Sequence, residues 1–170
     1  QTNPYQVKIL YDYIIKTANF KKNDSVYDLY CGTGTIGIYV ANLVKTVYGI
    51  EIVEDAIEDA KFNAKENNID NIQFYCGDLK DILDSKDMQD IEQPTTIIVD
   101  PPRPGLHSNT IKNILALSPN KIIYVSCNPA TMARDIELLV SEKYTIKDLQ
   151  PIDMFPHTPH IECVTTLILN

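Results

Sequence analysis

The sequence lacks several features that would place it in common protein classes. Basic residues are scarce, with 15 Lys and Arg against 23 Asp and Glu and a formal net charge of −8. This balance excludes a free-standing protein that binds nucleic acid by positive charge. It does not exclude a catalytic domain whose nucleic-acid binding comes from another part of a longer protein. No apolar run approaches the roughly 20 residues that span a bilayer, and no signal-peptide pattern opens the chain, so we expect no membrane partner.

Closely spaced cysteines are also absent. The four cysteines are Cys31, Cys76, Cys127 and Cys163, with no C-x-x-C pair. Zinc sites usually take their ligands from close pairs, so we predict no bound metal. A domain of this size needs no disulfides, which indicates a reducing, cytoplasmic setting. The chain opens with Gln1-Thr2-Asn3, which is not a natural start, so we expect residues 1–170 to be one domain of a longer protein.

What is present is an alternation of strand-like and helical segments. The strand-like runs are residues 26–30, 46–50, 72–76, 95–99 and 122–126. Helical periodicity separates them, most clearly over residues 53–67, where Ala56, Ile57, Ala60 and Ala64 form the expected buried stripe. An amphipathic helix precedes them, and the acidic residues 84–93 predict a surface excursion. This order predicts an α/β fold with a parallel sheet and helices on both faces.

The end of the chain breaks the alternation. Residues 144–149 and 164–169 are strand-like, and the segment between them is too rich in proline to hold a helix. A connection without a crossover helix predicts an antiparallel pair. The expected sheet therefore has seven strands, mostly parallel, with a reversed last strand. This layout resembles that of the Rossmann-like class I methyltransferases that use S-adenosyl-L-methionine (SAM).

A glycine-rich loop, residues 28–37, ends the first strand and opens a helix. Gly32, Gly34 and Gly37 satisfy the dinucleotide pattern G-x-G-x-x-G, so NAD is a competing ligand. The preceding Asp28 and the run D-L-x-C-G-x-G instead resemble the first motif of SAM methyltransferases. A cationic sulfonium tolerates a nearby carboxylate better than a pyrophosphate does.

Acidic residues close the next two strands. Glu51 can accept both hydroxyls of a ribose, in NAD and SAM enzymes alike, or it is a solvated charge at a strand end. Asp78 stands where an acidic residue commonly meets the adenine amino group, or it is a helix N-cap.

Two further loops carry the residues for chemistry. The fourth strand ends in Asp100-Pro101-Pro102-Arg103, whose prolines fix the loop. Amino-group methyltransferases have an aromatic residue at the position of Arg103, which can instead stack or bind phosphate. Cys127 follows the fifth strand near a helix start, where a thiol can have a lowered pKa and act as a nucleophile. A cysteine in this setting is otherwise a buried packing residue, as we expect for the other three.

Long motifs decide between these interpretations. Residues 126–135 (SCNPATMARD), residues 100–103 (DPPR) and residues 153–162 (DMFPHTPHIE) closely resemble the RNA uracil-C5 methyltransferases, which make 5-methyluridine. The resemblance implies SAM ligands at Gln1, Tyr30, Glu51 and Asp100, and also at Thr35, where some members have Asn. It also implies a nucleophile at Cys127 and a proton-abstracting base at Glu162.

The chemistry explains these residue types. Uracil C5 accepts a methyl group only after a thiolate has added to C6, and the C5 proton must then leave to a base. Glu162 is otherwise a charge at a strand edge. His157 and His160 are separated by prolines that exclude one helical face, so hydrogen bonds that shape the loop are expected of them rather than a metal.

The resemblance also implies a partner. The expected substrate is RNA, with ribosomal RNA favoured over transfer RNA, and the uridine splayed out of its stack. Family members often carry an upstream nucleic-acid-binding domain of OB type and sometimes an iron–sulfur cluster, neither of which this sequence contains. Two alternatives stay open: an amino-group methyltransferase that uses the Asp100 loop without a cysteine, and a non-catalytic Rossmann module that binds a nucleotide.

Overall fold

The computed structural model describes residues 3–83 and 91–170. Seven strands follow the order β3-β2-β1-β4-β5-β7-β6. The chain divides into two compact units, Phe20–Val99 and the combination of Gln1–Asn19 with Asp100–Asn170. Most of the predicted surface excursion, residues 84–90, lies outside the described residues.

The first unit, Phe20–Val99, is a parallel sheet with helices between its strands. Its elements are β1 (Ser25–Leu29), α2 (Thr35–Ala41), β2 (Thr46–Glu51), α3 (Glu54–Glu66), β3 (Ile72–Cys76), α4 (Leu79–Leu83) and β4 (Thr96–Val99). The pairs β3–β2, β2–β1 and β1–β4 are all parallel. Strands β1 and β4 are buried over their whole length, as is typical of strands covered on both faces.

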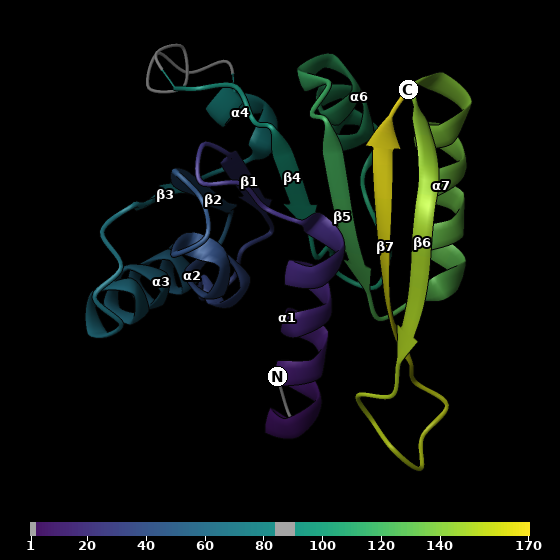
Figure 1. The fold of residues 1–170 in the computed structure, drawn as a ribbon, viewed down its shortest axis with the longest axis horizontal. Coiled ribbons are helices and arrows are strands. Elements are labelled where there is room, and N and C mark those ends of the chain that lie inside the picture. Colours follow the sequence, from purple (N-terminus) through teal and green to yellow (C-terminus); the bar gives the residue numbers. More distant parts are fainter. Residues whose placement is uncertain (1–2, 84–90) are drawn as a thin grey trace. The chain divides into compact units, whose positions relative to one another are not determined.

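The predicted helix over residues 53–67 forms as α3, one residue shorter at each end. It packs on β2, β3 and the neighbouring α2 (Figure 1). Ile57, Ala60 and Ala64 are its buried residues, whereas Ala56 is only half-buried. The small alanines let the helix lie close to the sheet beside the glycine-rich loop.

The second unit contains the reversed strand. Its elements are α1 (Pro4–Ala18), α6 (Ser108–Leu117), β5 (Lys121–Ser126), α7 (Pro129–Glu142), β6 (Tyr144–Ile152) and β7 (Glu162–Leu169). Strand β7 lies between β5 and β6 and is antiparallel to both. The predicted antiparallel pair is therefore confirmed, with the proline-rich segment as its connection (Figure 1, yellow).

Helices cover both faces of these three strands. Tyr124 of β5 donates a hydrogen bond to Asp135 of α7, so it faces that helix. Its neighbour Ile123 pairs with Thr166 of β7, whose hydroxyl bonds Thr17 of α1. Because successive side chains of a strand point to opposite faces, α1 and α7 pack on opposite sides of this part of the sheet. No helix in residues 3–83 or 91–170 is long and apolar enough to cross a membrane.

Candidate active site

Cys127 and Glu162 are brought together by strand pairing. In the antiparallel register of β5 and β7, Ser126 pairs with Cys163. Cys127 directly follows Ser126, and Glu162, the first residue of β7, directly precedes Cys163, so both flank this last pair of the ladder, and the charge of Glu162 acts on the Cys127 thiol. Residues 35 positions apart in the sequence thus meet because two strands run in opposite directions.

A tight turn holds Cys127 between its strand and the helix that follows. The backbone N–H of Asn128 donates to the Ser126 hydroxyl at 3.0 Å. Asn128 is the N-cap of α7, and its side chain accepts from the N–H of Ala130, while Pro129 occupies the first helical turn. These are strong start signals for a helix, so the position of Cys127 at a helix start is confirmed.

Glu162 is buried and lacks a partner for one of its oxygens. The residue is only 7% exposed, and Oε2 accepts no hydrogen bond from the described residues. Burial raises the pKa of this carboxyl above its usual value. A buried acceptor without a partner is costly, so it marks a group kept for something other than stability. A carboxyl of raised pKa holds a proton better than an ordinary glutamate, which suits a general base.

The Cys127 thiol lies among charges of both signs. Burial, the negative charge of Glu162 and, more weakly, that of Asp100 raise its pKa, while Arg103 lowers it. The sequence suggested a lowered pKa from the helix start alone. That suggestion is wrong, because burial and the charges of Glu162 and Asp100 raise the pKa more than Arg103 lowers it.

Asp100 belongs to the same cluster. Burial and the neighbouring charge of Glu162 raise the pKa of Asp100 to about 7. The second unit therefore brings three predicted site residues, Asp100, Cys127 and Glu162, within electrostatic range of one another. At neutral pH the cluster carries less negative charge than its residue types suggest, because the raised pKa of Asp100 favours its protonated form.

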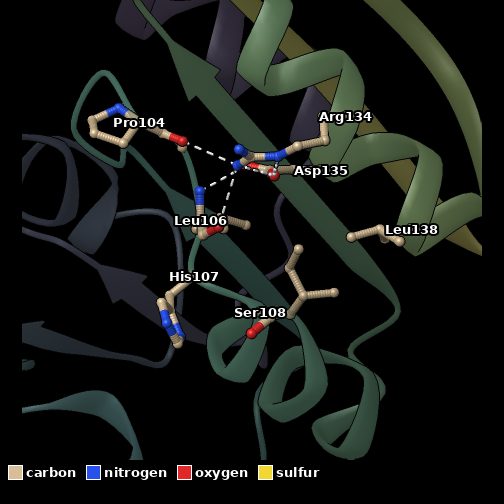
Figure 2. Close-up of a pocket in the computed structure, with 9 residues that line it drawn as sticks. Pro104, Leu106, His107, Ser108, Arg134, Asp135 and Leu138 are labelled. Atoms are coloured by element: carbon tan, nitrogen blue, oxygen red, sulfur yellow. Dashed lines mark hydrogen bonds and ion pairs between the residues drawn. The ribbon is translucent and has the colours of Figure 1, made fainter.

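A buried acidic residue fixes the loop that follows Asp100 (Figure 2). Asp135 is fully buried, and its Oδ2 accepts from the N–H of Leu106 and the hydroxyl of Tyr124, each at 2.7 Å. Its Oδ1 accepts from Nε and Nη2 of Arg134 at 2.8 and 2.6 Å. Arg134 also donates to the carbonyl of Pro104 at 3.0 Å, so one ion pair on α7 holds the loop at two points.

Two further contacts and one glycine complete this arrangement. The side chains of Asn128 and Thr131 both donate to the carbonyl of Arg103 at 3.1 Å. Gly105 has φ of +81°, and a Cβ there would come within 2.5 Å of Asp135 Oδ2. Arg134 and Asp135 belong to the motif of residues 126–135, but the sequence does not predict that they hold the loop after Asp100. Adjacent residues of opposite charge do not indicate which loop they contact.

We expect Asp135→Ala to destabilise the protein strongly. The change leaves the Tyr124 hydroxyl and the Leu106 N–H without their acceptor, and each unsatisfied buried donor costs about 1–3 kcal/mol. Denaturant unfolding measures the loss. Glu137→Ala, an exposed site on the same helix, is the control and should change the free energy of unfolding little. Equal free energies of unfolding for the two variants would show that the hydrogen bonds of Asp135 do not stabilise the protein.

Two carboxylates accept hydrogen bonds from the backbone of the glycine-rich loop in the first unit. Oε2 of Glu51 accepts from the N–H of Gly32 at 3.1 Å, and Oε1 accepts from Ile52 and Val53. Asp28 Oδ2 accepts from the N–H of Gly37 at 2.9 Å. Both negative charges act on the buried thiol of Cys31 and, after burial itself, raise its pKa.

This loop fits a positively charged ligand with a ribose. Gly32 has φ of +52°, and a Cβ added there would meet no atom within 4 Å, so a ligand can approach its backbone. The carboxylates of Asp28 and Glu51 favour a cationic sulfonium over a pyrophosphate. Glu51 keeps lone pairs beyond its three backbone bonds, which ribose hydroxyls can use.

The remaining predicted cofactor residues differ in how the structure describes them. Tyr30 follows β1 with a left-handed φ of 61°, and Thr35 is the exposed first residue of α2. Asp78 is exposed and directly precedes α4. Gln1 lies outside the described residues. Cofactor contacts of all four stay predictions.

We expect Glu51→Ala to weaken SAM binding by about 1–3 kcal/mol, the scale for losing hydrogen bonds to a charged group. Isothermal titration with SAM measures the change, and titration with NAD tests the competing ligand. Asp59→Ala, an exposed carboxylate on α3, is the matched control. Unchanged SAM affinity in a folded Glu51 variant would remove this residue from the site.

The other three cysteines do not all behave as expected. Cys31 and Cys163 are buried, so the prediction that they are packing residues is confirmed. Cys76 is exposed, and that prediction is wrong for it. It is the last residue of β3, an edge strand whose residues are only partly covered, so the strand pattern overstated its burial.

Comparison with known proteins shows the family of the chain. The family model of tRNA (uracil-5-)-methyltransferases matches residues 1–169. The chain belongs to this family. An uncharacterized RNA methyltransferase of Oceanobacillus iheyensis is 45% identical over 170 residues, which is 100% of this chain and 37% of that protein. One from Bacteroides thetaiotaomicron is 49% identical with the same coverage. This chain thus spans about 37% of the length of these relatives.

Solved structures agree with the family. The tRNA (uracil-54, C5)-methyltransferase of Pyrococcus abyssi, in complex with S-adenosyl-L-homocysteine, is 38% identical with a TM-score of 0.77. The match covers 92% of this chain and 37% of that one. A dimethyladenosine transferase from Plasmodium falciparum, 17% identical over 95% of this chain and 61% of its own, shares the fold with a TM-score of 0.68.

These matches confirm the predicted fold class, that of SAM methyltransferases with a seven-stranded, mostly parallel sheet and a reversed last strand. S-adenosyl-L-homocysteine is what SAM becomes on losing its methyl group, so the predicted cofactor agrees with the Pyrococcus enzyme. Membership of the uracil-5-methyltransferase family favours the predicted function over an amino-group methyltransferase and over a non-catalytic nucleotide-binding module.

Proposed function

We propose that this chain is the catalytic domain of a longer protein that transfers a methyl group from SAM to C5 of a uridine in RNA. The observation that carries the proposal is that Cys127 and Glu162 flank the last pair of the β5–β7 ladder, Ser126 and Cys163, and that one buried oxygen of Glu162 lacks a partner among the described residues. The charge of Glu162 acts on the Cys127 thiol. A nucleophile with a base beside it is what this reaction needs.

Cys127 acts first in the proposed reaction. Its thiolate adds to C6 of uracil, and the electron pair of the C5–C6 double bond moves onto C5 and the O4 enolate. C5 is then a nucleophile, and SAM supplies the electrophilic methyl group. Cys127 is partly exposed at a fixed turn, so a base splayed out of its RNA can reach it.

Glu162 acts after the methyl group has moved. Its carboxylate takes the remaining proton from C5, the C5–C6 double bond reforms, and the Cys127 thiolate leaves C6. The raised pKa of Glu162 favours its holding that proton. Asp100 and Arg103 act on the charge of the same thiol, and we propose that Arg103 offsets the two carboxylates when the thiolate forms.

For the cofactor we propose the predicted ligands. In the first unit these are Tyr30, Thr35, Glu51 and Asp78. In the second they are Asp100 and Gln1. What supports the proposal is the open space at Gly32 and the carboxylate of Glu51 beside it.

The RNA target is the finer part of the proposal. We keep the preference for ribosomal RNA over transfer RNA as a prediction, and the transfer-RNA specificity of the Pyrococcus enzyme makes tRNA the first competitor to test. Incubation of the full-length protein with SAM and each RNA, followed by nucleoside mass spectrometry, should give 5-methyluridine. A methylated amino group on a base would refute the uracil assignment, and methylation of tRNA alone would reverse the order of the two RNAs.

A further inference from the structure

A pocket of about 470 Å³ opens on the second unit, beyond the loop that follows Asp100. Its lining comes from the loop, the start of α6 and one face of α7 (Figure 2). The floor is apolar, with Leu106 and Ile111 buried, while Leu138 of α7 is 47% exposed. A volume of roughly 300–1,000 Å³ is usual for sites that hold small molecules or parts of larger ligands.

The polar groups at this pocket favour an anion. Among the described residues, Arg134 makes all its side-chain hydrogen bonds through Nε and Nη2, which leaves both hydrogens of Nη1 for a ligand. Its side chain is 53% exposed. Asp135 is the one acidic residue of the lining, and it is fully buried and paired with Arg134. The pocket therefore presents a guanidinium and no accessible carboxylate.

The charge pattern of the surrounding sequence agrees. Although the chain has a net charge of −8, all 23 acidic residues lie outside residues 101–134, a stretch that contains Arg103, Lys112, Lys121 and Arg134. Lys121 is engaged elsewhere, with the carbonyl of Ala18. This stretch holds the loop, α6 and the Cys127 turn, so these segments add no negative charge that would repel a polyanion, in contrast to the neighbouring Asp100 and Glu162.

The lining of the pocket follows a residue of the candidate active site along the chain. Arg103, whose charge acts on the Cys127 thiol, directly precedes Pro104, the first lining residue. The ion pair of Arg134 and Asp135 fixes the loop between them. The loop that begins at Asp100 therefore connects the candidate active site to the lining of the pocket.

We propose that this pocket holds a nucleotide of the RNA substrate that neighbours the target uridine, with its base against Leu138 and Pro104 and its phosphate on Arg134. The proposal rests on the proposed function for the identity of the RNA. Single-stranded RNA is usually held in this way, with bases against apolar or planar side chains and phosphates on arginine. The pocket would then select the nucleotide beside the target.

Two exposed aliphatic residues of α7 give a matched test. Leu138 lines the pocket, whereas Val140, 38% exposed, does not and lies about 200° around the helix. Leu138→Glu and Val140→Glu add the same charge to the same helix. In the full-length protein, we expect Leu138→Glu to weaken the binding of substrate RNA about tenfold or more, which is the effect of changing an energetically important interface residue. Val140→Glu should change RNA affinity by no more than about twofold. SAM affinity should be equal in both.

A second measurement does not depend on the charge variant folding. A benzophenone side chain introduced at Leu138 should crosslink to RNA at a nucleotide beside the target uridine, and one introduced at Val140 should not. Equal RNA affinities of the two glutamate variants, or no crosslink from position 138, would refute the proposal that the pocket holds RNA.

The outcomes separate this proposal from the proposed function. If the wild-type protein forms 5-methyluridine while the two variants bind RNA equally, the function stands and the pocket is refuted. If Leu138→Glu selectively loses RNA while no 5-methyluridine forms, the pocket is an RNA site and the uracil chemistry is refuted.

Discussion

Cys127→Ala is expected to abolish both methylation of uridine and every covalent complex with RNA. Without a thiolate at C6, uracil C5 has too little electron density to attack a methyl group, so the loss should be complete within the sensitivity of the assay. Nucleoside mass spectrometry measures 5-methyluridine, and a denaturing gel measures the protein–RNA adduct. Both use the full-length protein with SAM and a uridine-containing RNA.

Cys76→Ala is the matched control for this result. Cys76 is an exposed cysteine at the end of β3 and has no part in the proposed chemistry, so its variant should methylate RNA as the wild type does. SAM titration of the Cys127 variant shows whether its cofactor site is intact. Formation of 5-methyluridine by Cys127→Ala would refute the covalent mechanism and would favour the alternative of an amino-group methyltransferase that uses the Asp100 loop.

Glu162→Gln is expected to stop the reaction after methyl transfer. Glutamine keeps the size of the side chain but cannot take the C5 proton, so the thiol is not eliminated and the methylated RNA stays attached through Cys127. The expected signal is a slowly migrating protein–RNA band on a denaturing gel, with little release of 5-methyluridine.

The double variant Cys127→Ala with Glu162→Gln tests the origin of that band, which should vanish. If instead Glu162→Gln releases 5-methyluridine at the wild-type rate, another group removes the proton and Glu162 is a structural residue. A variant that neither methylates nor forms an adduct, although folded and able to bind SAM, would place Glu162 before methyl transfer.

Much of the fold could be predicted because local patterns and tertiary structure agree. Short β-rich runs alternate with helical stripes, and the prolines between residues 151 and 162 exclude a crossover helix, which reverses β7. The Cys127 turn was also readable, since Asn128 and Pro129 are helix start signals. The closeness of Cys127 and Glu162 was not, because strand register depends on pairing that no local pattern encodes.

What the sequence could not predict depends on surroundings rather than on residue type. The exposure of Cys76 follows from the edge position of β3, and the raised pKa of Cys127 follows from carboxylates that arrive from other segments. Asp135 was part of a recognised motif, but its bonds to Leu106 and Tyr124 are long-range contacts. The motif therefore identifies Asp135 but does not predict which groups its carboxylate binds.

The carboxylates around Cys127 also bear on how the nucleophile survives between turnovers. Peroxide and alkylating agents attack a thiolate far faster than a thiol, so reactivity follows the fraction that is deprotonated. Burial and the charges of Glu162 and Asp100 raise the pKa of Cys127, which lowers the fraction of this thiol that is deprotonated. The same environment therefore slows oxidation of the sulfur to sulfenic acid, a lesion that would remove the proposed nucleophile.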